Sequence, residues 1–160
     1  MTTSARIVQL NVSAGTVPKL PVSDASVEIV SLVGDGHHRH GHGGKDRAVV
    51  LFGIEQLEKL QGAGHPIQPG AIRENVATAG LDYRWLRDGD RLRLGQCVEV
   101  RVTGHAIACT TIAGAFAGGD VSRVREAKHR GMSRVTTRVL ATGEVAPGDP
   151  IQVLPRDASG

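Results

Sequence analysis

Val98-Glu99-Val100-Arg101-Val102-Thr103 is the stretch that decides the fold class. Valine alternates along it with charged or polar residues, and a period of two is typical of a β-strand with one buried face. The chain then continues as His105-Ala106-Ile107-Ala108-Cys109-Thr110-Thr111. We therefore expect a strand that leads directly into a loop of small residues containing a cysteine.

Cys109 is the candidate catalytic residue. A cysteine acts as a nucleophile, sulfur carrier or soft metal ligand only as its thiolate. His105, or the N-terminus of a helix beginning near Thr110, would favour that charged form. The alternative is a small buried hydrophobe in a well-packed turn. Cys97, the other cysteine, begins the strand and is predicted to be structural.

Composition favours one mostly β domain over residues 1–160, with a core at about 6–154 and a tail at 155–160. Twenty-one glycines and seven prolines predict many turns and therefore many short strands. The net charge of +3 suits a phosphate-bearing ligand. We expect no nucleic-acid partner, because one Trp, one Tyr and two Phe are too few for a base-stacking platform.

The sequence predicts a cytoplasmic protein without a membrane partner. Residues 1–9 have no apolar core of a secretory signal, and no segment reaches the roughly 18 apolar residues that cross a bilayer. Both cysteines should therefore be reduced.

The remaining elements follow from short-range patterns. Ile54, Leu57 and Leu60 recur at helical spacing, and Gly62 ends that helix. A second helix is predicted at 123–129, with Asp120 or Ser122 as its cap. Further strands are predicted at 6–12, 27–33, 48–52, 134–141 and 151–154.

A glycine- and histidine-rich loop spans residues 34–47. Four of the seven histidines lie here, which suggests a zinc site, but alternating His and Gly provide no rigid ligand geometry. Alternatively, the backbone of His42, Gly43, Gly44, Lys45 and Asp46 could approach an anionic ligand closely.

Arg73 and Asn75 form a second candidate binding element. They are two residues apart, so on an extended segment both side chains would point to the same side. A guanidinium and an amide could jointly hold a phosphate or a pterin edge there. The alternative is a solvated strand face.

Several short motifs, in this order and spacing, resemble the MOSC domain, the module named for the C-terminal part of molybdenum cofactor sulfurases, in its stand-alone form. The resemblance spans about 6–154. The motifs are His42-Gly43-Gly44-Lys45-Asp46-Arg47-Ala48-Val49, Gly70-Ala71-Ile72-Arg73-Glu74-Asn75, Gly80-Leu81-Asp82 with Leu86, Gly89-Asp90-Arg91-Leu92, Cys109 after a strand, and Pro147-Gly148-Asp149-Pro150.

The resemblance implies a distorted β-barrel with a few short peripheral helices, and a molybdenum cofactor (molybdopterin). Cys109 matches the family's signature cysteine, which ligates molybdenum in relatives that reduce N-hydroxylated compounds. Arg73 and Asn75 match an Arg-x-Asn element that resembles a clamp for the pterin phosphate. Residues 42–46 match a loop of the stand-alone members and would line the same pocket.

The chain also departs from the family pattern. Ala108 stands where the family often has proline, so the loop loses a rigid φ angle. No pyridoxal phosphate domain is expected, so the sulfurase step itself would not be carried out here.

Three functions remain open at this point. The first is a molybdenum-dependent oxidoreductase that reduces a small N-hydroxylated molecule, with electrons from a separate reductase. The second is a sulfur carrier that receives a persulfide on Cys109 from a cysteine desulfurase. The third is a non-enzymatic binding domain, in which loss of the Cys109 thiol would affect only packing.

Overall fold

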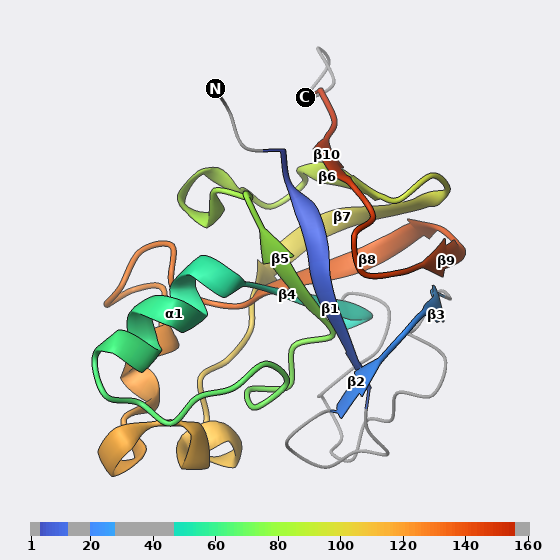
Figure 1. Ribbon diagram of the computed structural model, residues 1–160. Helices are drawn as coiled ribbons and strands as arrows, with labels where there is room; N and C mark the ends of the chain where they lie inside the picture. Colours follow the sequence, from blue (N-terminus) through green and yellow to red (C-terminus); the bar gives the residue numbers. More distant parts are fainter. Residues whose placement is uncertain (1–3, 13–19, 28–46, 156–160) are drawn as a thin grey trace.

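The fold is mostly β, as predicted (Figure 1). The computed structural model describes residues 4–12, 20–27 and 47–155. Over these ranges the strands are β1 (Arg6–Val12), β2 (Leu20–Val22), β3 (Ala25–Val27), β4 (Val49–Gly53), β5 (Val76–Ala79), β6 (Arg91–Leu94), β7 (Val98–His105), β8 (Val135–Ala141), β9 (Gly143–Val145) and β10 (Ile151–Val153). The helices are α1 (Ile54–Gly62) and the short 3-10 helices η2 (Tyr83–Trp85), η3 (Thr110–Ala115), η4 (Ala117–Gly119) and η5 (Val121–Val124).

Eight of these strands form one sheet in the order β10-β6-β7-β8-β4-β5-β1-β2. Strands β4 and β5 are parallel, and α1 is the crossover that joins them, whereas the other neighbouring pairs are antiparallel. This arrangement places β5 between β4 and β1, so the candidate binding element just before β5 lies next to these two strands.

The strand order is that of an open sheet, not of the closed barrel that the resemblance implied. The sheet nevertheless curls back on itself. The backbone N–H of Ile7 donates to Asp149 O at 2.8 Å, and that of Gly148 donates to Ile7 O at 2.7 Å. Beside them, Arg6 forms an isolated antiparallel bridge with Pro150. Part of the free edge of β1 is therefore paired by the chain that leads into β10.

The alternation that predicted β7 is present in the structure. Val98, Val100 and Val102 are buried in the main core, while Arg101 is exposed on the opposite face. The strand runs to His105, two residues beyond the predicted end. It pairs with β6 on one side and β8 on the other, so it lies well inside the sheet.

A second apolar cluster lies between α1 and the short helices after β7. Leu57 and Leu60 of α1 pack there with Ile72, Ile112 and other residues. Figure 1 shows η3 and its neighbours below α1, away from the top of the sheet. This cluster supports both segments that carry the candidate site residues, because Ile72 precedes Arg73 and Ile112 follows Cys109.

The predicted helix over 123–129 is wrong: Asp120 does act as a cap, but the helix it starts is the four-residue η5, and Arg125 is already extended. Glu126 accepts a hydrogen bond from Gly131 N, so the following residues close a turn instead of continuing a helix.

Most of the strand predicted at 27–33 lies outside the described residues. None of the described helices has the length and apolar character needed to cross a bilayer.

Candidate functional site

Cys109 lies where the chain leaves β7 and enters η3. Its backbone is extended (φ −126°, ψ 170°), and it is the N-terminal flanking residue of this 3-10 helix. Its carbonyl accepts from Ile112 N at 3.2 Å, and its side chain is half-buried. Neither Cys109 nor Cys97 forms a disulfide, and Cys97 lies exposed in the turn before β7. The structure thus holds Cys109 as a free cysteine in a defined backbone position.

The segment containing Arg73 and Asn75 is a turn, so the extended geometry predicted for it is wrong. Arg73 has φ +69°, and it is the one non-glycine residue with positive φ in the described part of the chain. Its N–H donates to Gly70 O at 3.3 Å, and β5 begins only at Val76. Because a left-handed residue breaks the extended geometry of a strand, the argument that residues two apart point to the same side does not apply here.

Asn75 is buried and locks this turn against the sheet. Its carboxamide oxygen accepts from Val50 N at 2.8 Å. Its backbone N–H donates to Val50 O at 2.8 Å, and its carbonyl accepts from Asn11 N at 2.8 Å. Asn75 therefore fixes the turn relative to β4 and β1, whatever it contributes to a ligand.

Arg134 joins the two candidate segments and was missed by the sequence reasoning. Its side chain is 4% exposed. One terminal nitrogen donates to Ile72 O at 2.7 Å, and the other donates to Ile107 O at 2.7 Å. No local signal could have found it, because an arginine at the start of a strand is common and its partners are distant in sequence.

Glu74 brings a buried acid to the same region. Its carboxyl is fully buried, and this burial raises its pKa to about 7. The backbone amides of Gly70, Ile72 and Glu74 itself, together with the Arg134 charge, oppose that rise. Burial likewise lowers the pKa of Arg134 to about 10, while the negative charges of Glu74 and Cys109 oppose this change and Arg73 adds to it.

Buried polar atoms without hydrogen-bond partners concentrate here. They include Nε of Arg134, the hydroxyl of Thr111 and both carboxyl oxygens of Glu74, which the nearby backbone amides of Gly70, Ile72 and Glu74 approach without forming hydrogen bonds of good geometry. Buried polar groups are normally paired, so such a group of orphans indicates that a polar ligand or water completes the site. A guanidinium and a hydroxyl can donate to anionic oxygens, and a carboxyl that is easily protonated can both donate and accept. These donors and acceptors fit a phosphate-bearing, nitrogen-rich ligand such as a pterin.

The remaining predicted site residues lie outside the described residues. These are His42, Gly43, Gly44, Lys45 and Asp46, together with the other histidines of that loop. Within the described ranges, no three His, Cys, Asp or Glu side chains are grouped so as to hold a metal ion.

His105 has an acidic neighbour. Its Nδ1 lies 3.9 Å from a carboxylate oxygen of Glu126, in the loop before β8. The predicted helical start beside Cys109 is present, but as the six-residue 3-10 helix η3.

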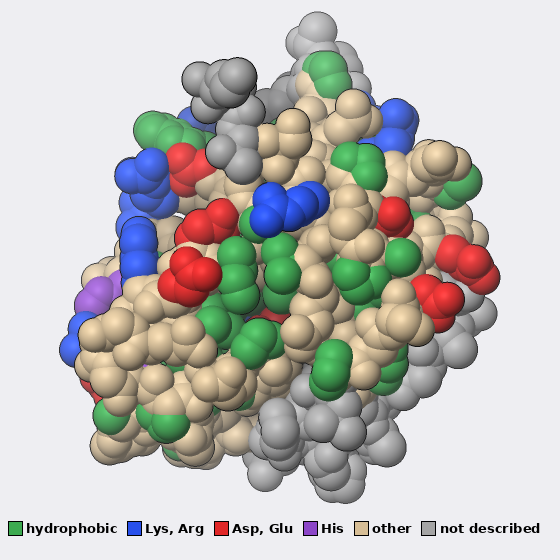
Figure 2. Space-filling model, viewed as in Figure 1, with side chains coloured by type: hydrophobic (Ala, Val, Ile, Leu, Met, Phe, Trp, Pro, Cys, Tyr) green, Lys and Arg blue, Asp and Glu red, His purple; other side chains and the backbone are tan. Residues whose placement is uncertain are grey.

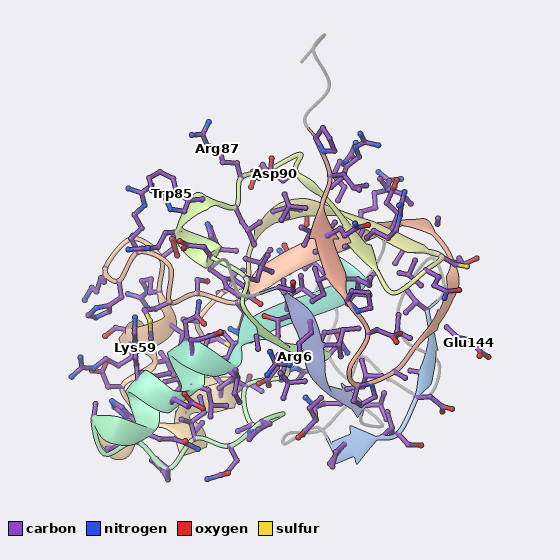
Figure 3. All side chains as sticks on the ribbon, turned by 45° about the horizontal axis from the view of Figure 1, so that its top comes forward. Arg6, Lys59, Trp85, Arg87, Asp90 and Glu144 are labelled. Atoms are coloured by element: carbon purple, nitrogen blue, oxygen red, sulfur yellow. The ribbon has the colours of Figure 1, made fainter. Side chains whose placement is uncertain are left out.

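A separate cavity of about 320 Å³ lies on another part of the molecule, near η2 and the first turns of α1. Its lining includes Lys59, Arg84 and Arg130. Figure 2 shows several Lys and Arg side chains along the left edge of the molecule in that view. Nearby Trp85 is 59% exposed and points outward in Figure 3, with the Arg130 guanidinium 5.5 Å from its ring. None of the predicted site residues lines this cavity.

Comparison with known proteins identifies the class of protein. The sequence model of the MOSC domain matches residues 38–152, which is most of the chain. The chain therefore belongs to the MOSC domain family, a family associated with molybdenum cofactor binding.

Individual relatives agree with this assignment. The chain is 31% identical over 120 residues to the uncharacterized protein YflK of Bacillus subtilis, covering 74% of this chain and 53% of YflK. It is 28% identical over 130 residues to a protein of Gibberella moniliformis named "Reductase", covering 78% of this chain and 23% of that protein. The chain thus spans about half of the first relative and about a quarter of the second.

Solved structures support the fold. The YUAD protein from Bacillus subtilis superposes with a TM-score of 0.76 at 18% identity, covering 93% of this chain and 94% of that one. At this level of identity the likeness concerns the fold alone.

Proposed function

We propose that the chain binds a molybdenum cofactor and provides the molybdenum site of an oxidoreductase that reduces small N-hydroxylated compounds. The observation that carries the proposal is the arrangement around Arg134. This buried guanidinium binds Ile107 O, two residues before the half-buried Cys109, and Ile72 O, directly before the buried Arg73, and unpartnered buried polar atoms lie in the same segments. Membership of the MOSC family supports the choice of ligand.

In this proposal each residue has a defined task. Cys109, as the thiolate, would be the protein ligand of molybdenum, because a soft sulfur ligand suits this metal. Arg73 and Arg134 supply the positive charge for the anionic part of the cofactor, and Thr111 offers a hydroxyl donor. The sequence motif of His42, Gly43, Gly44, Lys45 and Asp46 is the remaining element that we assign to cofactor binding. Asn75 keeps the Arg73 turn in place through its bond to Val50.

The bound cofactor would supply a two-electron redox centre. The net reaction is R–NHOH + 2e⁻ + 2H⁺ → R–NH₂ + H₂O, in which the N–O bond breaks and the oxygen leaves as water. The electrons come from a separate reductase protein. The protein's own contribution is to bind, to orient and to exclude bulk water. We place the activity in the cytoplasm, where Cys109 stays reduced.

The test is the molybdenum and pterin content of untagged protein from a host that makes the cofactor. We expect about one of each per chain in the wild type, because a single Cys109 site binds it, and substantial loss in Cys109→Ser. Cys97→Ser is the matched control, since Cys97 is exposed in a turn outside the site. Wild-type protein that retains neither molybdenum nor pterin would contradict the proposal.

The second candidate is a sulfur carrier. Ile107, two residues before Cys109, is 64% exposed, so a partner protein can reach this loop. Transfer would move the terminal sulfur of a desulfurase persulfide to the Cys109 thiolate, forming Cys109–S–SH and releasing the donor thiolate. Mass spectrometry after incubation with a cysteine desulfurase and cysteine distinguishes the two, because only a carrier gains 32 Da on Cys109.

A further inference from the structure

The side chain of Arg134 binds two backbone carbonyls that lie far from it in the sequence. It sits just before β8, and its two terminal nitrogens bind carbonyls that are 62 and 27 residues away along the chain. Ile72 directly precedes Arg73, and Ile107 lies two residues before Cys109. One guanidinium therefore touches the backbone of both halves of the candidate site.

Charge pairing does not explain this burial. Arg134 forms no ion pair within the described part of the chain, and Glu74 acts on it only at longer range. Burying a guanidinium is costly without compensation, and here two short hydrogen bonds to neutral carbonyls provide direct compensation, to which the more distant charge of Glu74 adds. The planar fork of arginine makes this geometry possible, whereas the single ammonium of lysine would not span both carbonyls in the same way.

We propose that Arg134 is a positioning residue that clamps the Arg73 turn and the Cys109 loop at a fixed separation, so that both contact the same bound ligand. The identity of the ligand rests on the proposed function; the clamp does not. Nε of Arg134 stays buried without a partner, so a donor remains available at the clamped junction.

Hydrogen–deuterium exchange on cofactor-free protein tests the clamp. Its reporters are the amides of Asn75, Ala106 and Ile112, which are hydrogen-bonded in the two segments. In Arg134→Met we expect their exchange to rise about tenfold or more, the effect of losing a hydrogen bond to a charged donor, while amides in the middle of β7 stay protected. Arg134→Lys should restore little of this protection. Arg93→Met is the control, because Arg93 is an exposed residue of β6.

A double variant separates clamping from charge compensation and also covers the case that Arg134→Met unfolds. Glu74→Met with Arg134→Met removes both buried charges, and such replacements are often tolerated. The clamp predicts that the double variant folds but that the three reporter amides still exchange rapidly. If their protection returns, Arg134 only neutralised Glu74 and the proposal is overturned. Unchanged exchange in a folded Arg134→Met would overturn it as well.

Cofactor retention gives a second readout. In a host that makes the cofactor, Arg134→Met should retain several-fold less pterin than wild type although Cys109 is intact. Retention equal to wild type would overturn the link between the clamp and the ligand. If wild-type protein itself retains no pterin, the proposed function fails, while the exchange experiment still decides whether Arg134 is a clamp.

Discussion

The carboxamide oxygen of Asn75 accepts a hydrogen bond from the backbone N–H of Val50 at 2.8 Å, and both groups lie where β4 and the Arg73 turn meet. The same two residues are also joined by a backbone hydrogen bond from Asn75 N to Val50 O. Asn75 thus forms both hydrogen bonds to Val50 of β4, in the way that a residue of a neighbouring strand would, although β5 begins only at the next residue. The residue is needed for the shape of the site even before any ligand binds.

Asn75→Ala should destabilise the protein by about 1–3 kcal/mol, because it leaves the partly buried Val50 N–H without its side-chain acceptor. The free energy of unfolding in urea measures this. Gln152→Ala, at an exposed position of β10, is the control and should change it by less than about 0.5 kcal/mol. Equal stability of the two variants would show that the Asn75 bond contributes nothing.

Replacing Arg73 by Gly and by Ala separates the role of its backbone from that of its side chain. Glycine adopts φ +69° without strain, whereas the Cβ atom of alanine is strained at this angle. The free energy of unfolding of Arg73→Gly should therefore be about 1 kcal/mol higher than that of Arg73→Ala. Both variants should retain less pterin, since both lack the guanidinium. Urea unfolding and pterin analysis give the two readouts. If Ala proves as stable as Gly, the positive φ is not adopted in solution.

Stability should fall as the pH rises through the titration range of Glu74. Burial raises the pKa of Glu74 from 4.5 to about 7, so the folded state holds this proton more tightly than the unfolded chain. The free energy of unfolding should therefore decrease from about pH 4.5 to about pH 7 and stay level above, by about 3 kcal/mol at most.

Urea unfolding at pH 5, 6, 7 and 8 (about one-unit steps across this range) measures this dependence. Glu74→Gln keeps the side-chain shape without the charge and should remove this part of the pH dependence, leaving that of the other groups. A wild type and a Glu74→Gln variant with parallel curves would contradict a buried, ionisable Glu74.

The two cysteines should differ in reactivity. Cys97 is exposed in a turn, whereas Cys109 is half-buried, so a maleimide should label Cys97 several-fold faster in the native cofactor-free protein. Peptide mapping by mass spectrometry assigns each label. Denaturation should abolish the difference, and Cys97→Ser should leave only the slow phase. Faster labelling of Cys109 would instead indicate an exposed, strongly activated thiolate.

Local patterns predicted much of the fold. The alternation at 98–103 and the helical spacing from Ile54 correctly predicted β7 and α1, because each pattern is complete within one element. The predicted helix at 123–129 failed because Glu126 pairs with Gly131 N, a turn contact that competes with helical continuation. The motifs also predicted the MOSC family, which the family match over residues 38–152 confirms, whereas the roles of Cys109 and Arg73 stay predictions.

The sequence by itself determined a mostly β chain, one helix between β4 and β5, and a cysteine in the loop after a half-buried strand, since these depend on periodicity and order along the chain. Only the tertiary structure decided the left-handed conformation of Arg73, the bond between Asn75 and Val50, and the place of Arg134 between Ile72 and Ile107. The physical reason is the range of the contacts: these partners lie 25 to 62 residues apart, so they meet only once the sheet has formed.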